Sequence, residues 1–205
     1  MTTVTTEASQ ALVGQPIEAA DTPALYVDLD ALDHNASLMA QRASEQGVAW
    51  RPHVKASKSP DLAKRLLASG AQGITCAKVG EAEAMAAGGI DDILIANEIV
   101  GPQKIARLIA VAQQARLCVA VDDPRNIEEL SQAASEAGIT LDVLVDINIG
   151  ANRCGVTPEA APALARAVLD APALNLRGLM GYEGHVVGIS DLEEKEAKSQ
   201  IAAEI

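Results

Sequence analysis

Short apolar runs alternate with segments in which apolar residues recur at helical spacing along most of this chain. The runs are rich in Val, Ile and Leu, as strands buried in a parallel sheet usually are. Strands are predicted at residues 24–29, 49–55, 73–77, 92–97, 116–121, 141–148 and 176–182. Most of these runs begin about 24 residues apart, a spacing that suits a repeated strand–helix unit.

Helix start signals stand between the apolar runs. Ser59 is a favourable N-cap before Pro60, and Gly70 suits the end of the same helix. Further starts are predicted at Pro102, at Pro124 after Asp123, at Pro158 after Thr157, and at a capping box formed by Ser190 and Glu193. Apolar stripes at helical spacing comprise Leu32, Ala36, Met39 and Ala43, and Ile105, Leu108, Ile109 and Ala112.

Repeated strand–helix units with apolar strands predict an α/β fold, a (β/α)8 TIM-type barrel. The rival is a doubly wound open sheet, but no GxGxxG turn follows the first predicted strand. Because the sequence ends within the seventh predicted helix, we expect the barrel to be incomplete, without its last strand or strands. Residues 1–21 are predicted to be a mobile N-terminal arm, and residues 22–205 a partial barrel domain.

Composition narrows the possible partners. Hydrophobic residues make up 49% of the chain but aromatic residues only 1%, so the core is expected to be aliphatic. The net charge of −12 and the lack of a basic stripe argue against nucleic acid as a partner. The sequence shows no signal peptide and no apolar run of membrane-spanning length. Three separated cysteines predict free thiols in a reducing compartment, which favours the cytoplasm.

Candidate chemistry lies at the predicted carboxyl ends of the strands, where barrel enzymes place their active sites. Lys55 and Lys78 are near-equal candidates for Schiff-base chemistry, because partial burial would free a lysine amine as a nucleophile. The alternative is that both are solvated charges on the rim. The other polar strand-end residues are His53, Asn97, Glu98, Asp122, Asn148, Arg153, Tyr182, Glu183 and His185. Their spacing predicts no metal site and no Ser/His/Asp arrangement.

The combination of "TPALYVDLDALDHN", "RPHVKASKSPDLAKRLLASGAQGITCAKVGEAEA", "VDINIGANRCGV" and "GLMGYEGH" carries a family likeness. It resembles the fold-type III pyridoxal-phosphate enzymes, the alanine racemase N-terminal-domain superfamily. The likeness covers about residues 22–190 and is strongest to the D-threonine aldolase and D-serine dehydratase group. Any one of these motifs alone would be weak, whereas their order along the chain is specific.

The resemblance implies that Lys55 forms a Schiff base with pyridoxal 5′-phosphate. Arg153 matches the family arginine that reaches toward the phenolic oxygen of the cofactor or the carboxylate of the substrate. Tyr182 matches the position of a ring that lies close to the pyridine. His53 is two residues before Lys55 on the same predicted strand, so it is expected either to line the cofactor pocket or to make a structural hydrogen bond.

The function implied by the resemblance is that of a pyridoxal-phosphate-dependent lyase acting on β-hydroxy D-amino acids, similar to D-threonine aldolase. Alternatives are an ammonia-lyase similar to D-serine dehydratase, an alanine racemase, and a non-catalytic carrier of the cofactor. The racemase is disfavoured because no "VKADAYG"-like run surrounds Lys55, and the carrier because no "SKTKP"-like run does. Ser57 departs from the family pattern, since many relatives have histidine there.

The sequence also ends before the glycine-rich phosphate-binding stretch and the C-terminal β-domain of the family. The resemblance therefore implies a divalent metal, a D-amino acid substrate and a homodimer only for the full-length protein.

Overall fold

The computed structural model describes residues 12–205 and contains one parallel sheet of five strands. The strands are β1 (Ile74–Cys76), β2 (Asp92–Glu98), β3 (Arg116–Val121), β4 (Leu141–Ile147) and β5 (Leu174–Gly181). The α-helices are α2 (Leu29–Glu45), α3 (Pro60–Ala68), α4 (Val79–Ala87), α5 (Pro102–Ala112), α6 (Pro124–Glu136), α7 (Ala161–Asp170) and α8 (Leu192–Ala203). Two 3-10 helices, η1 (Ile17–Ala19) and η2 (Gly184–Val186), complete the described elements.

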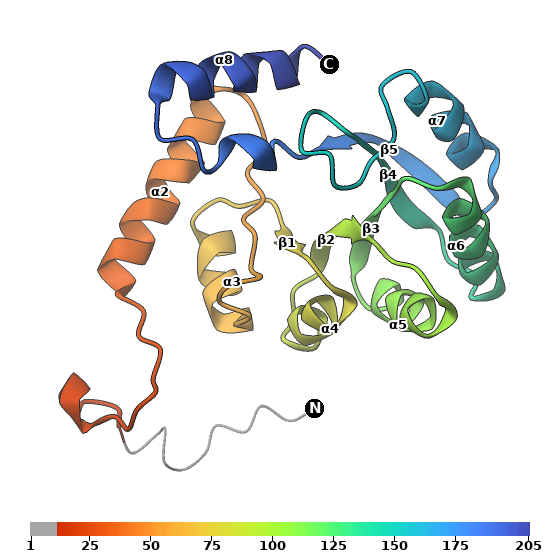
Figure 1. Cartoon of the computed structure of the whole chain (residues 1–205). Helices are drawn as coiled ribbons and strands as arrows, with labels where there is room; N and C mark the ends of the chain where they lie inside the picture. The colour runs from red at the N-terminus through yellow and green to blue at the C-terminus, as the bar shows by residue number, and fades with distance from the viewer. Residues whose placement is uncertain (1–11) are drawn as a thin grey trace.

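The strands lie side by side in the order in which they occur along the chain, and every neighbouring pair is parallel. A doubly wound sheet would reverse direction at a switch point, whereas a barrel adds each strand on the same side. Helices α3 to α7 form an arc around one face of the curved sheet (Figure 1). The described residues thus form part of a (β/α) barrel, which confirms the prediction of an incomplete barrel.

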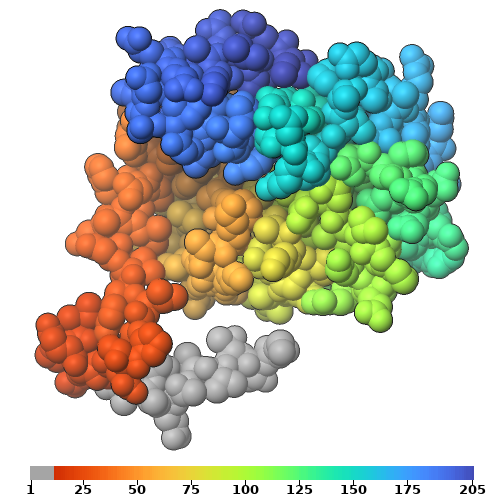
Figure 2. Space-filling model, in the orientation of Figure 1, coloured from red at the N-terminus to blue at the C-terminus, as the bar shows by residue number. Residues whose placement is uncertain are grey.

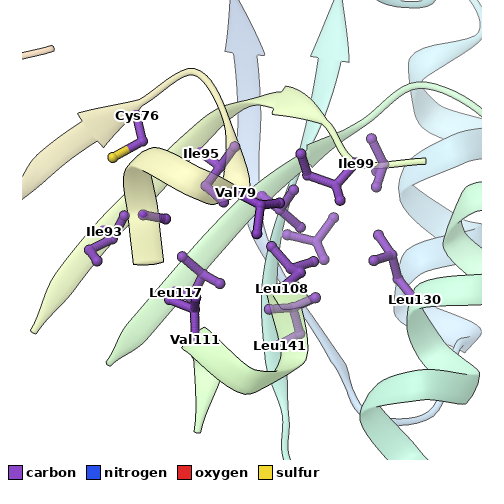
Figure 3. Packing of buried hydrophobic residues seen from close by; sticks show 14 of the residues in the cluster. Cys76, Val79, Ile93, Ile95, Ile99, Leu108, Val111, Leu117, Leu130 and Leu141 are labelled. Atoms are coloured by element: carbon purple, nitrogen blue, oxygen red, sulfur yellow. The ribbon is translucent and has the colours of Figure 1, made fainter. Parts of the chain in front are cut away.

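The hydrophobic core lies between the sheet and this arc of helices. Cys76, Ile95, Val119 and Val143 are in register across four neighbouring strands, and all four are fully buried. Side chains of α4, α5 and α6 pack onto this face, as Figure 3 shows for Val79, Leu108 and Leu130. The layer between the sheet and the helices is therefore filled by aliphatic side chains, as the aromatic-poor composition predicted. Their close packing fixes the position of the carboxyl ends of the strands.

Residues 24–29, predicted as a strand, do not form one. Residues 24–28 have no regular structure, and Leu29 already begins α2. The side chain of Asp28 accepts a hydrogen bond from the backbone N–H of Ala31 and so caps this helix. An isolated strand needs a neighbour for its backbone groups, and residues 24–29 have no strand partner within residues 12–205.

Residues 49–55 are extended beside β1 but are not a regular strand. His53 forms a single parallel bridge with Thr75, supported by hydrogen bonds from the Thr75 amide to Pro52 and from the Val54 amide to Thr75. Pro52 has no N–H to donate, so the ladder cannot continue regularly through it. The remaining predicted strands are present within a few residues of their predicted bounds.

Most of the predicted helix starts are confirmed, and two are wrong. The Ser59 side chain caps α3, and the Asp123 side chain caps α6. Helix α7 begins at Ala161, because residues 158–160 form a turn after Thr157. At α8 the N-cap is Asp191, whose carboxylate accepts from the Glu194 amide, so the capping box predicted at Ser190 is not formed.

From residue 12 to the start of α2, the chain extends away from the body of the molecule (Figure 2). Of the predicted arm, residues 1–11 lie outside the described residues, and almost all of residues 12–21 are exposed. The mobility of this arm stays a prediction. Cys76, Cys118 and Cys154 are free thiols, as expected. None of the helices in residues 12–205 has the length and apolar character that crossing a bilayer requires.

Candidate active site

One cavity of about 530 Å³ is lined by all four residues that the sequence singled out as a binding site. These residues are His53, Lys55, Arg153 and Tyr182. Around them lie Ala77, Leu94, Ala96, Asn97, Cys154, Met180 and Gly181, which come from the inner face and the carboxyl ends of the strands. The volume falls in the range of about 300–1,000 Å³ that is typical of small-molecule sites.

Lys55 lies in the turn that links the extended segment 49–54 to α3, and its side chain is exposed. The partial burial of a lysine expected from the sequence is therefore not found in the described residues, and Lys78 is exposed as well. The His53 Nδ1 atom accepts a hydrogen bond of 3.2 Å from the Lys55 backbone amide. His53 thus both lines the cavity and fixes the backbone that carries Lys55, which unites the two roles predicted for it.

The surroundings of the His53 imidazole favour its neutral form. Burial, and after it the positive charge of Lys55, lowers the pKa of His53 below its ordinary value of 6.5. Because Nδ1 accepts the Lys55 hydrogen bond, the proton of the neutral ring is on Nε2. The ring thus presents one N–H donor that the bond to Lys55 does not use.

Arg153 is carried by a closed loop, residues 148–156, that returns onto the end of β4. Backbone hydrogen bonds join Asn148 to Val156 and Val156 to Asp146, with lengths of 2.8 and 3.0 Å. Inside the loop, the side-chain oxygen of Asn148 accepts from the amides of Gly150 and Asn152. These bonds fix the loop from within, so the backbone position of Arg153 is set by the loop itself.

Gly155 makes the close return of this loop possible. Its φ is +91°, and a Cβ atom there would lie 2.7 Å from the carbonyl carbon of Ile147. Only glycine combines that backbone angle with that proximity. The Gly155 amide also donates a 3.0 Å hydrogen bond to the Asp122 carboxylate at the end of β3. The glycine in "RCGV" is therefore what holds Arg153 and Cys154 against the strand ends.

The guanidinium of Arg153 lies over the ring of Tyr182, with its carbon 5.1 Å from the ring centroid. This is cation–π geometry, and it orients a long side chain that would otherwise be free in solvent. Tyr182 follows β5, and Lys55 follows the extended segment beside β1. The amine and the guanidinium–ring pair thus come from opposite ends of the sheet and face the same cavity.

Lys78, the rival of Lys55 in the sequence, lines a different cleft of about 670 Å³. It is the residue before α4 and shares this cleft with Lys58, Lys104 and Arg107. Arg107 forms an ion pair with Glu83, and Lys58 lies 3.7 Å from Glu81. Neither Arg153 nor Tyr182 reaches this cleft, so the structure separates two lysines that the sequence could not distinguish.

Two weaker candidates from the sequence have structural roles. The Asn97 amide donates to the Ala77 carbonyl at 3.0 Å and its oxygen accepts from the Glu98 amide, although Asn97 also borders the cavity. The His185 ring lies against Gly150, and its buried Nδ1 has no hydrogen-bond partner among the described residues. His185 does not line the cavity that Lys55 faces.

A cluster of two carboxyl groups and a thiol adjoins the cavity, and sequence reasoning missed its central member. Glu98, Asp146 and Cys154 place one ligand atom each within 4.8 Å of one another. Burial, followed by the neighbouring Glu98 carboxylate, raises the pKa of Asp146 to about 7. The one available signal was an aspartate at position 146 near the end of a strand that is otherwise apolar after Asp142.

The cavity fits an anionic aromatic aldehyde. A primary amine, a guanidinium fixed over an aromatic ring and a neutral imidazole surround a space whose walls include Leu94, Ala96 and Met180. An amine can hold an aldehyde carbon covalently, and a planar guanidinium can hold a phenolate or carboxylate oxygen through two N–H groups. This donor set suits pyridoxal 5′-phosphate and an amino acid substrate.

Comparison with known proteins identifies aldolases as relatives of this chain. The curated relatives include a D-threonine aldolase from Arthrobacter sp, 44% identical over 94% of this chain and 51% of the relative. They also include a 3-hydroxy-D-aspartate aldolase from Paracoccus denitrificans, 41% identical over 94% of this chain and 50% of the relative. The chain spans about half the length of these relatives. Dehydratase and racemase relatives are more distant.

A solved structure has the same fold over most of the chain. The crystal structure of D-threonine aldolase from Filomicrobium marinum superposes with a TM-score of 0.88 at 46% identity, covering 90% of this chain and 50% of that one. The family model described as "Alanine racemase, N-terminal domain" matches residues 27–204. Because this match covers far more than half of the residues, the chain belongs to the alanine racemase N-terminal domain family.

Proposed function

We propose that the protein is a pyridoxal-phosphate-dependent lyase that cleaves β-hydroxy D-amino acids to glycine and an aldehyde. The observation that carries this proposal is the common cavity of Lys55, His53, Arg153 and Tyr182. Relatives that include a D-threonine aldolase at 44% identity and a 3-hydroxy-D-aspartate aldolase at 41% support an aldolase over a dehydratase or a racemase.

Each residue of the cavity has a distinct task in this proposal. Lys55 would hold the cofactor through its amine. Arg153, oriented by Tyr182, would bind an oxygen anion of the cofactor or of the substrate carboxylate. His53 keeps the Lys55 backbone in place through Nδ1 and leaves its Nε2 proton available as a donor. When bound, the cofactor supplies the electron-withdrawing ring that this bond cleavage needs.

Binding by this set of residues favours substrates with a carboxylate and a short side chain. The apolar wall formed by Leu94, Ala96 and Met180 suits the side-chain end of a small amino acid, while Arg153 can hold its charged end. The proposal therefore places a D-amino acid with a β-hydroxyl group and an apolar side-chain end, such as D-threonine, in the cavity.

Three further parts of the proposal concern the protein at its native length. We expect it to need a divalent metal whose ligands lie outside residues 1–205, to form a homodimer and to reside in the cytoplasm. Support comes from the family likeness and, for the cytoplasm, from three free thiols in the described residues. Light scattering would measure the oligomer, and dialysis against a chelator followed by an activity assay would test the metal.

Product analysis tests the reaction itself. The native-length protein, supplied with pyridoxal phosphate and a divalent metal, should release acetaldehyde and glycine from D-threonine but not from L-threonine. Pyruvate and ammonia from D-serine as the main products would replace the aldolase with a dehydratase. Racemisation of alanine would replace it with a racemase, and cofactor binding without any turnover would leave a non-catalytic carrier.

A further inference from the structure

Glu98, Asp146 and Cys154 converge from three separate parts of the chain. Glu98 ends β2, Asp146 lies in β4 one residue before its end, and Cys154 is held in the loop 148–156 by the close return at Gly155. Their ligand atoms all lie within 4.8 Å of one another. Because two of the three positions are in strands and the third is in a loop fixed by backbone bonds, the cluster is built into the fold.

The two carboxyl groups lack the partners that buried charges normally have. Asp146 is only 4% exposed, and its carboxyl group faces the Glu98 carboxyl group and the Cys154 thiol. The Oε1 atom of Glu98 is buried and has no hydrogen-bond partner among the described residues. Leaving such groups unpaired is costly, and a bound cation is one of the few ways to satisfy them together.

The negative charges around the cluster also favour the binding of a cation. Asp122, whose carboxylate accepts from the Gly155 amide next to Cys154, adds a further negative charge beside the cluster. Arg153 precedes Cys154 in the chain and lines the same small hollow, and its guanidinium lies over the ring of Tyr182. With two carboxylates and a thiolate as ligands, a dication and Arg153 together would bring the cluster to neutrality.

The ligand types select the kind of cation. Cysteine thiolate with carboxylates favours zinc-type ions over magnesium or calcium, which prefer oxygen alone. Three protein ligands leave a fourth position of a tetrahedral ion open. A small hollow lined by Asp146, Arg153, Cys154 and Tyr182 adjoins the cluster. On the other side, Glu98 borders the larger cleft that contains Lys78, and this cleft offers an entry path for the cation.

We propose that Glu98, Asp146 and Cys154 form a binding site for one divalent cation of zinc type, with its fourth position open toward the hollow beside Arg153. Binding exchanges the thiol proton, and any proton shared by the two carboxyl groups, for the cation, and these protons leave to solvent. The ion ties the ends of β2 and β4 to the loop that carries Arg153. This site is separate from the metal expected outside residues 1–205 and does not rest on the proposed function.

The test is a titration of the 205-residue chain with Co²⁺, because Zn²⁺ itself has no useful absorbance. A cysteine thiolate bound to Co²⁺ gives a strong charge-transfer band, and this band should saturate at one ion per chain and disappear when Zn²⁺ is added. Cys154→Ala and Cys154→Ser should abolish the band. Glu98→Gln and Asp146→Asn should each weaken binding by about 10- to 100-fold.

Cys118→Ala is the matched control, because Cys118 is also a partly buried thiol near an acidic side chain but is not a member of the cluster. It should leave the band unchanged. A titration without a charge-transfer band would overturn the proposal. So would a band that survives both Cys154 variants, or one that Cys118→Ala removes. The serine variant, which is close in size to cysteine, keeps the test valid if the alanine variant folds poorly.

Discussion

Lys55 and Lys78 follow neighbouring apolar runs and look equivalent in the sequence, yet they lie in different surroundings. Lys55 faces a cavity with an arginine stacked on a tyrosine, and its backbone is held by His53. Lys78 faces a cleft with other cations, among them Lys58 and Arg107, which are balanced by glutamates. The difference shows that a lysine becomes a candidate for covalent chemistry through residues contributed by distant segments.

The largest effect is expected from removing one lysine or the other. Lys55→Ala should prevent covalent attachment of pyridoxal phosphate and lower lyase activity by more than about a thousandfold, because the amine is the attacking atom. Lys78→Ala should change activity by less than about threefold, since it lies outside the cavity. Borohydride reduction followed by peptide mass spectrometry locates the label. A label on Lys78 would reverse the comparison.

A smaller effect is expected from breaking the loop that brings Arg153 to the cavity of Lys55. Gly155→Ala adds a Cβ atom against the Ile147 backbone at a φ of +91°, so the free energy of unfolding should fall by about 2–5 kcal/mol through strain and overlap. Gly138→Ala is the matched control, because Gly138 also has a positive φ but nothing within 4 Å of its Cβ position.

The control should cost only about 1–2 kcal/mol, the price of the backbone angle alone. Urea unfolding of both variants measures the difference. Equal losses in the two variants would mean that the close return of the loop does not constrain the structure, and that Arg153 reaches the cavity by some other means.

The smallest effect concerns the pH dependence of stability at His53. Its pKa is lowered in the folded state, so the unfolded chain takes up a proton first as the pH falls. Stability is therefore fully present above about pH 6.5, declines as the pH falls from there toward the folded-state pKa, and is constant below it. The wild-type chain should lose more stability between pH 7.5 and 5.0 than His53→Gln does.

Urea midpoints at the two pH values give the measurement, and His34→Gln, a change on the exposed surface of α2, is the control. The His34 variant should keep the pH dependence of the wild type. If His53→Gln keeps it as well, His53 is not the source of this pH dependence, and the lowered pKa assigned to it is wrong.

Local signals in the sequence were sufficient for much of the architecture. The alternation of strands and helices, the caps at Ser59 and Asp123 and the placement of Lys55 just before a helix were all predictable. These features depend on residues close together in the chain, where side-chain size, hydrogen bonding to nearby amides and apolar periodicity decide the conformation. Arg153 and Tyr182 were assigned to the site because the motifs that contain them resemble those of a known family.

Tertiary structure alone decided that residues 24–29 do not form a strand and which polar residues meet. Residues 24–29 have a strand-like sequence but no neighbour to pair with in residues 12–205, and Asp28 caps a helix instead. Glu98, Asp146 and Cys154 carry no recognisable spacing, because their convergence depends on the order of strands in the sheet and on the return of a loop at Gly155. A sequence specifies local conformation through short-range contacts, whereas a site assembled across a sheet exists only once the strands have paired.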